Sequence, residues 1–169
     1  MALTVETGAI VPGADSYVDV AYVRDFLSSR GYDLSEDDAT IEGHIRIMTD
    51  FIDEEDFKGH RIETDQPLAW PRGAVYLRDD RVLDDDKIPE KLKQAVAWGL
   101  LYRTQGNLFE ESGTDNISEA QVSVIKVKFT NRTQGYEDKT TLSDMVMVYR
   151  ALSDLLVGGG IDNRRIHRA

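Results

Sequence analysis

The residues most able to do chemistry in this chain are its clustered aspartates. Asp84, Asp85 and Asp86 follow one another, and Asp79 and Asp80 lie just before them. Carboxylates bind divalent cations, but a calcium loop needs oxygen ligands at alternate positions, a turn glycine and a terminal glutamate. Residues 79–86 lack this pattern, so we interpret the run as a solvated surface.

Other catalytic and metal-binding patterns are missing from the sequence. Its three histidines, His44, His60 and His167, have no HxxxH or HExxH spacing, and there is no cysteine for a thiolate site. No serine lies in a G-x-S-x-G turn, and the glycine run at 158–160 is followed by Ile-Asp-Asn instead of Lys-Ser/Thr. We therefore expect a protein that is not an enzyme and that uses neither a metal nor another cofactor.

Aromatic and basic side chains together suit single-stranded DNA, whose bases stack on aromatic rings. The candidates are Trp70, Trp98, and the pair Lys126 and Lys128 beside Phe129. The alternative interpretation is that Trp98 lies in the core, Trp70 anchors its loop and the lysines form the solvated face of a strand. We favour this structural interpretation.

The net charge of −11 argues against a protein that binds nucleic-acid backbones through counterion release. The last 12 residues differ, since their three arginines and one aspartate give +2 and leave −13 for residues 1–157. No apolar run of about 18 residues is present for a membrane span, and the N-terminus lacks the basic start and apolar centre of a signal peptide. We expect a protein that is made in the cytosol and does not enter a membrane.

The stretch from Gln66 to Gly106 predicts the centre of the fold. Proline suits a first helical position and glycine suits a left-handed cap, so a helix is expected from Pro89 to Gly106. Its apolar residues cover more than one stripe, which indicates burial on several sides. The preceding Leu-Ala-Trp-Pro-Arg loop, residues 68–72, is stiffened by prolines and is expected to be held in position.

Three further helices are expected around this one. The first runs from Val20 to Arg30, with Asp19 as its N-cap and Gly31 as its stop. The second begins near Ser35, where Ser35 and Asp38 approximate a capping box, and ends near Asp56. The last runs from Leu142 to Val157 and stops at Gly158.

The rest of the chain predicts arms and one β excursion. Residues 1–18 are expected to form an extended arm, and residues 107–140 a long excursion whose strand runs from Gln121 to Thr130 because its second half alternates. The predicted fold is therefore mainly α, a small bundle of about four helices with a β-strand or hairpin excursion and extended N- and C-terminal arms. Residues 1–157 are expected to form the helical domain and residues 158–169 a flexible arm.

The composition of this arm is typical of a segment that orders on a partner. A glycine hinge precedes arginines that can bind carboxylates and isoleucines that can fill pockets. The candidate docking residues are Gly158, Gly159, Gly160, Ile161, Arg164, Arg165, Ile166 and Arg168.

Several of these segments resemble a known family of phage proteins. They are PGADSYV and the helix ending SSRG within residues 9–31, the LAWPR loop with Gly73 and Tyr76, the IPEKLKQA helix start, and the ending LLVGGGIDNRRIHRA. Together they resemble tailed-phage head-tail adaptor, or connector, proteins, many of which carry the label of a DnaT-like single-stranded-DNA-binding protein. The resemblance covers both ends and the middle, and leaves residues 107–140 largely unsupported.

The resemblance implies a structural subunit of the virion neck, made in the bacterial host cytoplasm. Such subunits form a homo-oligomeric ring under the portal protein, join it to the next neck, stopper or tail protein, and line a conduit through which DNA passes without specific binding. Residues 158–169 would then dock on the portal. A closed ring needs two complementary patches on each subunit, which we expect in residues 66–83 and 107–140. The interface candidates are Trp70, Arg72, Lys126 and Lys128.

A different class of function stays open. The label carried by the family indicates a single-stranded-DNA-binding replication factor. Tight binding of single strands by the isolated subunit would favour this alternative over the adaptor.

Overall fold

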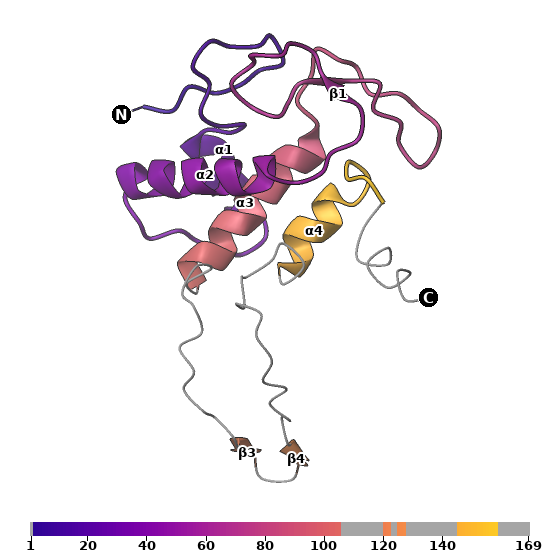
Figure 1. Ribbon diagram of the computed structural model, residues 1–169. Coiled ribbons are helices and arrows are strands. Elements are labelled where there is room, and N and C mark those ends of the chain that lie inside the picture. Colours follow the sequence, from indigo (N-terminus) through magenta and orange to yellow (C-terminus); the bar gives the residue numbers. More distant parts are fainter. Residues whose placement is uncertain (1, 106–119, 123–124, 128–144, 159–169) are drawn as a thin grey trace, which may run out of the picture.

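The computed structural model describes residues 2–105, 120–122, 125–127 and 145–158, and it is mainly helical as predicted. These residues form four α-helices and two small antiparallel sheets (Figure 1). The elements are α1 (Val20–Ser28), α2 (Asp38–Asp53), β1 (His60–Arg61), β2 (Arg72–Gly73), α3 (Glu90–Gln105), β3 (Ala120–Val122), β4 (Ile125–Val127) and α4 (Val146–Leu152).

Helix α1 closely follows its sequence signals. The Asp19 side chain accepts a hydrogen bond from the Tyr22 N–H at 2.7 Å, which is the expected N-cap. The helix ends at Ser28, two residues before the predicted end, and Gly31 has a positive φ of 82°. The apolar face on Val23, Phe26 and Leu27 is buried as predicted.

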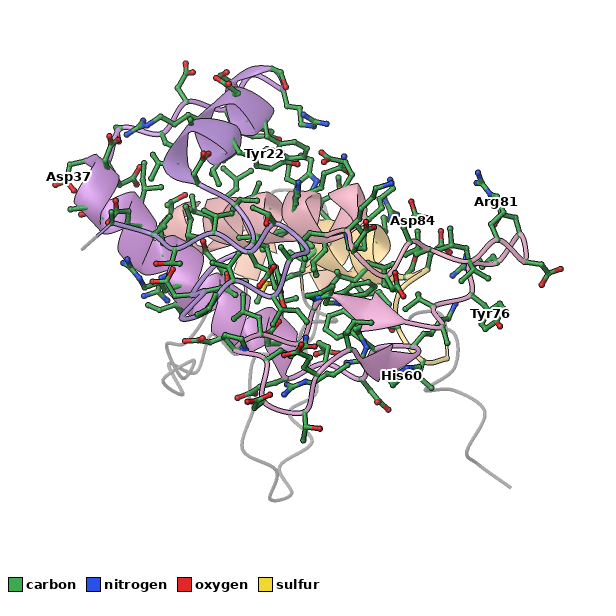
Figure 2. The ribbon with its side chains drawn as sticks, turned by 90° about the horizontal axis from the view of Figure 1, so that it is seen from above. Tyr22, Asp37, His60, Tyr76, Arg81 and Asp84 are labelled. Atoms are coloured by element: carbon green, nitrogen blue, oxygen red, sulfur yellow. The ribbon has the colours of Figure 1, made fainter. Side chains whose placement is uncertain are left out.

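Helix α2 begins later than predicted, and the expected capping box at Ser35 is wrong. Asp37 is the N-cap, and its carboxylate accepts from the Thr40 N–H at 2.7 Å (Figure 2). This hydrogen bond lowers the pKa of the Asp37 carboxyl. Asp37 is the N-cap because its carboxylate lies three residues before the free Thr40 N–H, whereas Ser35 lies two residues further from the helix start.

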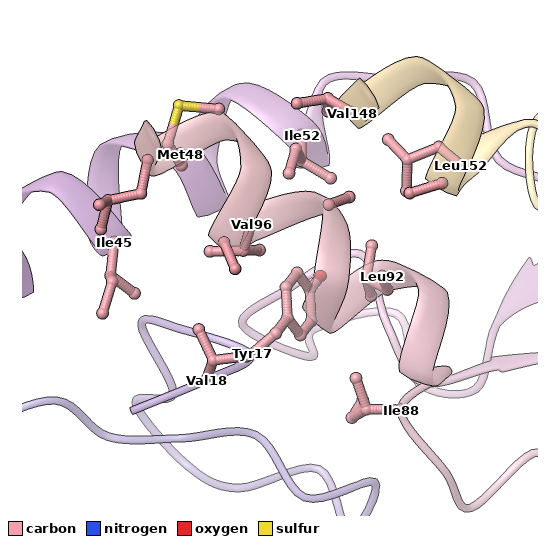
Figure 3. Packing of buried hydrophobic residues seen from close by; sticks show 14 of the residues in the cluster. Tyr17, Val18, Ile45, Met48, Ile52, Ile88, Leu92, Val96, Val148 and Leu152 are labelled. Carbon is pink, nitrogen blue, oxygen red and sulfur yellow. The ribbon is translucent and has the colours of Figure 1, made fainter. Parts of the chain in front are cut away.

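Helix α3 lies at the centre of the bundle and packs on each of the other three helices. Leu92, Val96 and Leu100 are fully buried, and the close approach of Met48 to Gly99 joins α2 to α3. Figure 3 shows α2, α4 and the residues Tyr17 and Val18 around this helix. The expectation that the central helix is covered on several sides is confirmed.

Helix α4 is shorter than the predicted helix from Leu142 to Val157. Residues 142–144 lie outside the described residues, and the helix ends at Leu152. Beyond it the backbone pairs with residues 56–58, because Lys58 N–H donates to the Leu155 carbonyl at 2.9 Å and Val157 N–H donates to the Asp56 carbonyl at 2.8 Å. The Leu155 carbonyl and the Val157 N–H are therefore used in tertiary hydrogen bonds instead of helical ones. The predicted stop, Gly158, has a φ of 84°.

The predicted single strand from Gln121 to Thr130 is wrong. Strands β3 and β4 are two arms of an antiparallel hairpin in which Val122 faces Ile125. Alternation in a sequence reports the strand period and carries no information about a chain reversal. Lys128, Phe129 and most of the 107–140 excursion lie outside the described residues, and neither described strand packs extensively on a helix.

The N-terminal segment is not the extended arm that its glycines indicated. Val5 forms a β-bridge with Ser16, so the residues between them form a closed loop. The side chain of Glu6 is buried inside this loop. The Glu6 carboxylate accepts from the N–H groups of Gly8 at 2.8 Å, Ile10 at 3.1 Å and Val11 at 2.8 Å. One side chain thereby satisfies backbone donors that would otherwise be buried without partners.

Candidate functional site

The loop of residues 66–73 is fastened to the core by a polar network. The Tyr17 hydroxyl donates to Asp53 and accepts from the Trp70 N–H at 3.1 Å, while the other Asp53 oxygen accepts from the Ala69 N–H at 2.7 Å. Burial raises the pKa of both Tyr17 and Asp53. The network joins the N-terminal segment, the end of α2 and the loop, so the prediction of a positioned loop is confirmed.

Trp70 is fully buried inside its own subunit. Its ring lies edge-on to Phe57 at a centroid distance of 5.6 Å, and the bond to Pro71 is cis. The expectation that Trp70 anchors its loop is confirmed. Because it has no exposed surface, we do not retain it as a candidate for subunit contact.

Arg72, one of the predicted interface candidates, makes its hydrogen bonds inside its own subunit. Its guanidinium donates to the carbonyls of Lys58 at 2.8 Å, Gly59 at 3.1 Å and Phe57 at 3.3 Å. Burial lowers its pKa. The five donors of a guanidinium suit a turn of converging carbonyls, so Arg72 holds the 57–59 turn against β2.

The other predicted docking residues are only partly described. Lys126 lies in β4 opposite Gln121, and Gly158 is the last described residue of the C-terminal arm. Lys128 and residues 159–169 lie outside the described ranges, so their contacts stay predictions.

Two of the three histidines fall within the described residues, and they lie on different elements. His44 lies in α2 and His60 in β1, and the pKa of His44 is lowered by burial and by Arg103. His167 lies outside the described residues. Within the part of the chain that is described, no group of three or more His, Cys, Asp or Glu side chains is placed to hold a metal ion.

A cluster that the sequence interpretation missed lies where α1 meets α3. We call it the aromatic patch, and it comprises Tyr22, Phe26, Arg30, Tyr32 and Trp98. Trp98 lies edge-on to Phe26 at 5.5 Å and to Tyr32 at 6.2 Å, and Tyr22 stacks on Phe26 at 6.0 Å. The Arg30 guanidinium carbon lies 3.6 Å from the centre of the Phe26 ring.

The patch is open to solvent at one edge. Tyr32 is 40% exposed, while Phe26 is buried beneath Arg30. The Tyr22 hydroxyl donates to Glu90 at 2.6 Å, and burial, followed by this bond, raises its pKa. The sequence carried a signal for the patch. Tyr22 and Phe26 lie four residues apart on one face of α1, and Arg30 follows at the same spacing just beyond the helix end. An exposed ring beside an arginine can stack a planar group such as a nucleobase.

Comparison with known proteins places the chain in a family. A family model described as "Putative DnaT-like ssDNA binding protein" matches residues 1–169. The chain belongs to this DnaT-like family. No curated protein and no solved structure matches it. In the described ranges of this DnaT-like chain, no helix is long and apolar enough to cross a membrane.

Proposed function

We propose that this chain is a head-tail adaptor of a tailed phage, which forms a ring under the portal and joins it to the next neck or tail protein. The observation that carries this proposal is the charge of the folded body. Residues 2–105 contain 22 acidic and 12 basic residues, a net charge of −10. A wall with this charge repels phosphates, so DNA passes along it without being held.

The construction of the body supports the same role. The N-terminal loop is closed around Glu6, and the 66–73 loop is fixed by Tyr17 and Asp53. A ring subunit needs surfaces that keep their shape before assembly, because ordering them on contact would weaken the interface. In this proposal Lys126 and Lys128 contact the neighbouring subunit, and residues 158–169 dock on the portal in the virion.

The second candidate is a single-stranded-DNA-binding protein, and the description of the family favours it more directly than it favours the adaptor. The aromatic patch is the structural observation that agrees with it. Tyr32 and Trp98 offer ring surface to a base, and Arg30 offers a charge to a phosphate. The acidic side chains Asp25 and Glu90 on the same two helices oppose that use.

The two functions separate in a fluorescence-anisotropy titration of the full chain with an oligothymidine at low and moderate salt. The adaptor predicts no binding at moderate salt, and it predicts ring-shaped particles when the chain is mixed with the portal protein encoded in the same genome. Salt-resistant binding that is lost in Tyr32→Ala and kept in Tyr76→Ala would overturn the adaptor in favour of the second candidate. Tyr76 is the matched control because its ring is 58% exposed and it is not part of the aromatic patch.

The docking role of the arm has its own test. Removal of residues 158–169 should leave the fold intact, because the described core ends at Leu156. The same truncation should abolish co-assembly with the portal, measured by sedimentation and electron microscopy. Normal co-assembly of the truncated chain would show that portal docking resides elsewhere.

A further inference from the structure

Three exposed apolar side chains lie on segments that are bonded to one another next to the last described residue of the chain. Tyr76, Val82 and Val157 are 58%, 53% and 59% exposed, and they are three of the six large hydrophobic side chains exposed among the described residues. We call them the terminal surface. Apolar side chains gathered in this way mark contacts with a partner segment.

Hydrogen bonds tie the three segments of the terminal surface together. Tyr76 and Val82 are paired across a β-bridge. The Lys58 ammonium donates to the Tyr76 carbonyl at 3.2 Å and to the Asp154 carbonyl at 2.8 Å, and Arg78 forms an ion pair with Asp154 at 2.8 Å. The surface is therefore a fixed part of the body before any partner arrives.

The segment that carries Tyr76 and Val82 also carries exposed aspartates before and after Val82, which we call the acidic edge. Figure 2 shows Tyr76 and Asp84 at one end of the molecule, away from Asp37 at the other. Asp79 is paired with Arg81 and Asp84 with Lys87. The exposed side chains of Asp80, Asp85 and Asp86 form no ion pair with any other described residue. Their charges are left to attract a basic segment.

We propose that residues 159–169 of the same chain occupy the terminal surface in the free subunit. Gly158 follows Val157 directly, so this segment begins at the edge of the surface. Its Ile161 and Ile166 suit the apolar side chains, and its arginines suit the free aspartates. Eleven residues reach up to roughly 36 Å when extended, and attachment gives an effective concentration in the millimolar range.

The contact has a consequence that rests on the proposed adaptor function. If residues 158–169 also dock on the portal, the terminal surface and the portal compete for the arm. The apparent affinity for the portal is then the intrinsic affinity multiplied by the fraction of subunits whose arm is free. Loss of the acidic edge should strengthen portal binding by the inverse of that fraction.

Because the chain has no cysteine, disulfide crosslinking of the full chain tests the contact directly. A protein with Val82→Cys and Asn163→Cys keeps every charge of the arm and of the acidic edge. The control combines Asn163→Cys with Ala39→Cys. Ala39 is an exposed residue in the first turn of α2, two residues after Asp37, which Figure 2 shows at the other end of the body. Mild oxidation at low protein concentration is followed by mass spectrometry of unreduced peptides.

We expect the Val82→Cys pair to form the intramolecular disulfide at least several-fold faster than the Ala39→Cys pair. Changing Asp80, Asp85 and Asp86 to Asn in the same protein should reduce that rate several-fold. Equal rates for the two pairs, or disulfides that form mainly between molecules, would overturn the proposal. No portal is present in this experiment, so equal crosslinking rates would not count against the adaptor function. Conversely, a failure of portal docking would not count against the contact between the arm and the terminal surface.

Discussion

Tyr17 and Asp53, 36 positions apart in the chain, are joined by a hydrogen bond from the phenol to the carboxylate. The same phenol accepts from the Trp70 N–H. This one residue therefore links the N-terminal segment to α2 and to the loop that carries Trp70.

Tyr17→Phe removes the linking hydroxyl and keeps the ring. We expect a loss of about 1–3 kcal/mol in the free energy of unfolding, because the Trp70 N–H and one Asp53 oxygen lose a buried partner. Urea denaturation followed by circular dichroism measures it. Tyr32→Phe is the control, since Tyr32 is 40% exposed, and the prediction fails if the two variants are equally stable.

The Asp53 carboxyl predicts a pH dependence of stability with a definite sign. Burial raises its pKa above the ordinary 3.8, so the folded state binds this proton more tightly than the unfolded state does. Its contribution to stability is fully present below 3.8 and is lost as the pH rises through the folded-state pKa. The free energy of unfolding of the native chain minus that of Asp53→Asn should therefore fall with rising pH. The subtraction cancels the other carboxylates, and a difference that rises instead would contradict the assignment.

Arg72→Ala and Trp70→Ala should both destabilise the fold. Loss of the Arg72 hydrogen bonds to the carbonyls of residues 57–59 costs about 1.5–3 kcal/mol, and removal of the buried Trp70 ring costs about 3–5 kcal/mol. Thermal unfolding measures both, with Arg81→Ala, a change at an exposed arginine, as a control expected to leave stability unchanged. If Arg72→Ala kept full stability and impaired only assembly, the arginine would have the interface role first expected.

Gly59→Ala tests the close approach of the 57–59 turn to β2. Gly59 has a φ of 71°, and a methyl group there would overlap the carbonyl oxygen of Gly73. Gly31→Ala is a matched control, since its φ is 82° and no atom lies within 4 Å of the added methyl. Both changes carry the strain of a positive φ, so Gly59→Ala should cost roughly 1–3 kcal/mol more than Gly31→Ala in urea denaturation. Equal losses of unfolding free energy in the two variants would show that the 57–59 turn can move away from β2 without cost.

Local signals determined much of this fold from the sequence alone. Asp19 and Gly31 set the ends of the first helical segment, and the apolar residues of α3 predicted a helix covered on several sides. A capping residue or an apolar repeat acts on backbone groups within a few residues of its own position. Its effect is therefore kept in the folded chain. The mainly helical class, the hairpin alternative and the anchoring role of Trp70 all follow from such signals.

Tertiary structure decided what no local pattern encodes. The end of α4 was set by pairing with residues 56–58, the N-terminal loop by the pairing of Val5 with Ser16, and the role of Arg72 by three carbonyls of one turn. In each case the partner lies on another segment or on a backbone group whose direction depends on the whole fold. The sequence supplied side chains able to make these hydrogen bonds. Which of the bonds form depends on burial, because a buried donor or acceptor without a partner raises the free energy of the folded state.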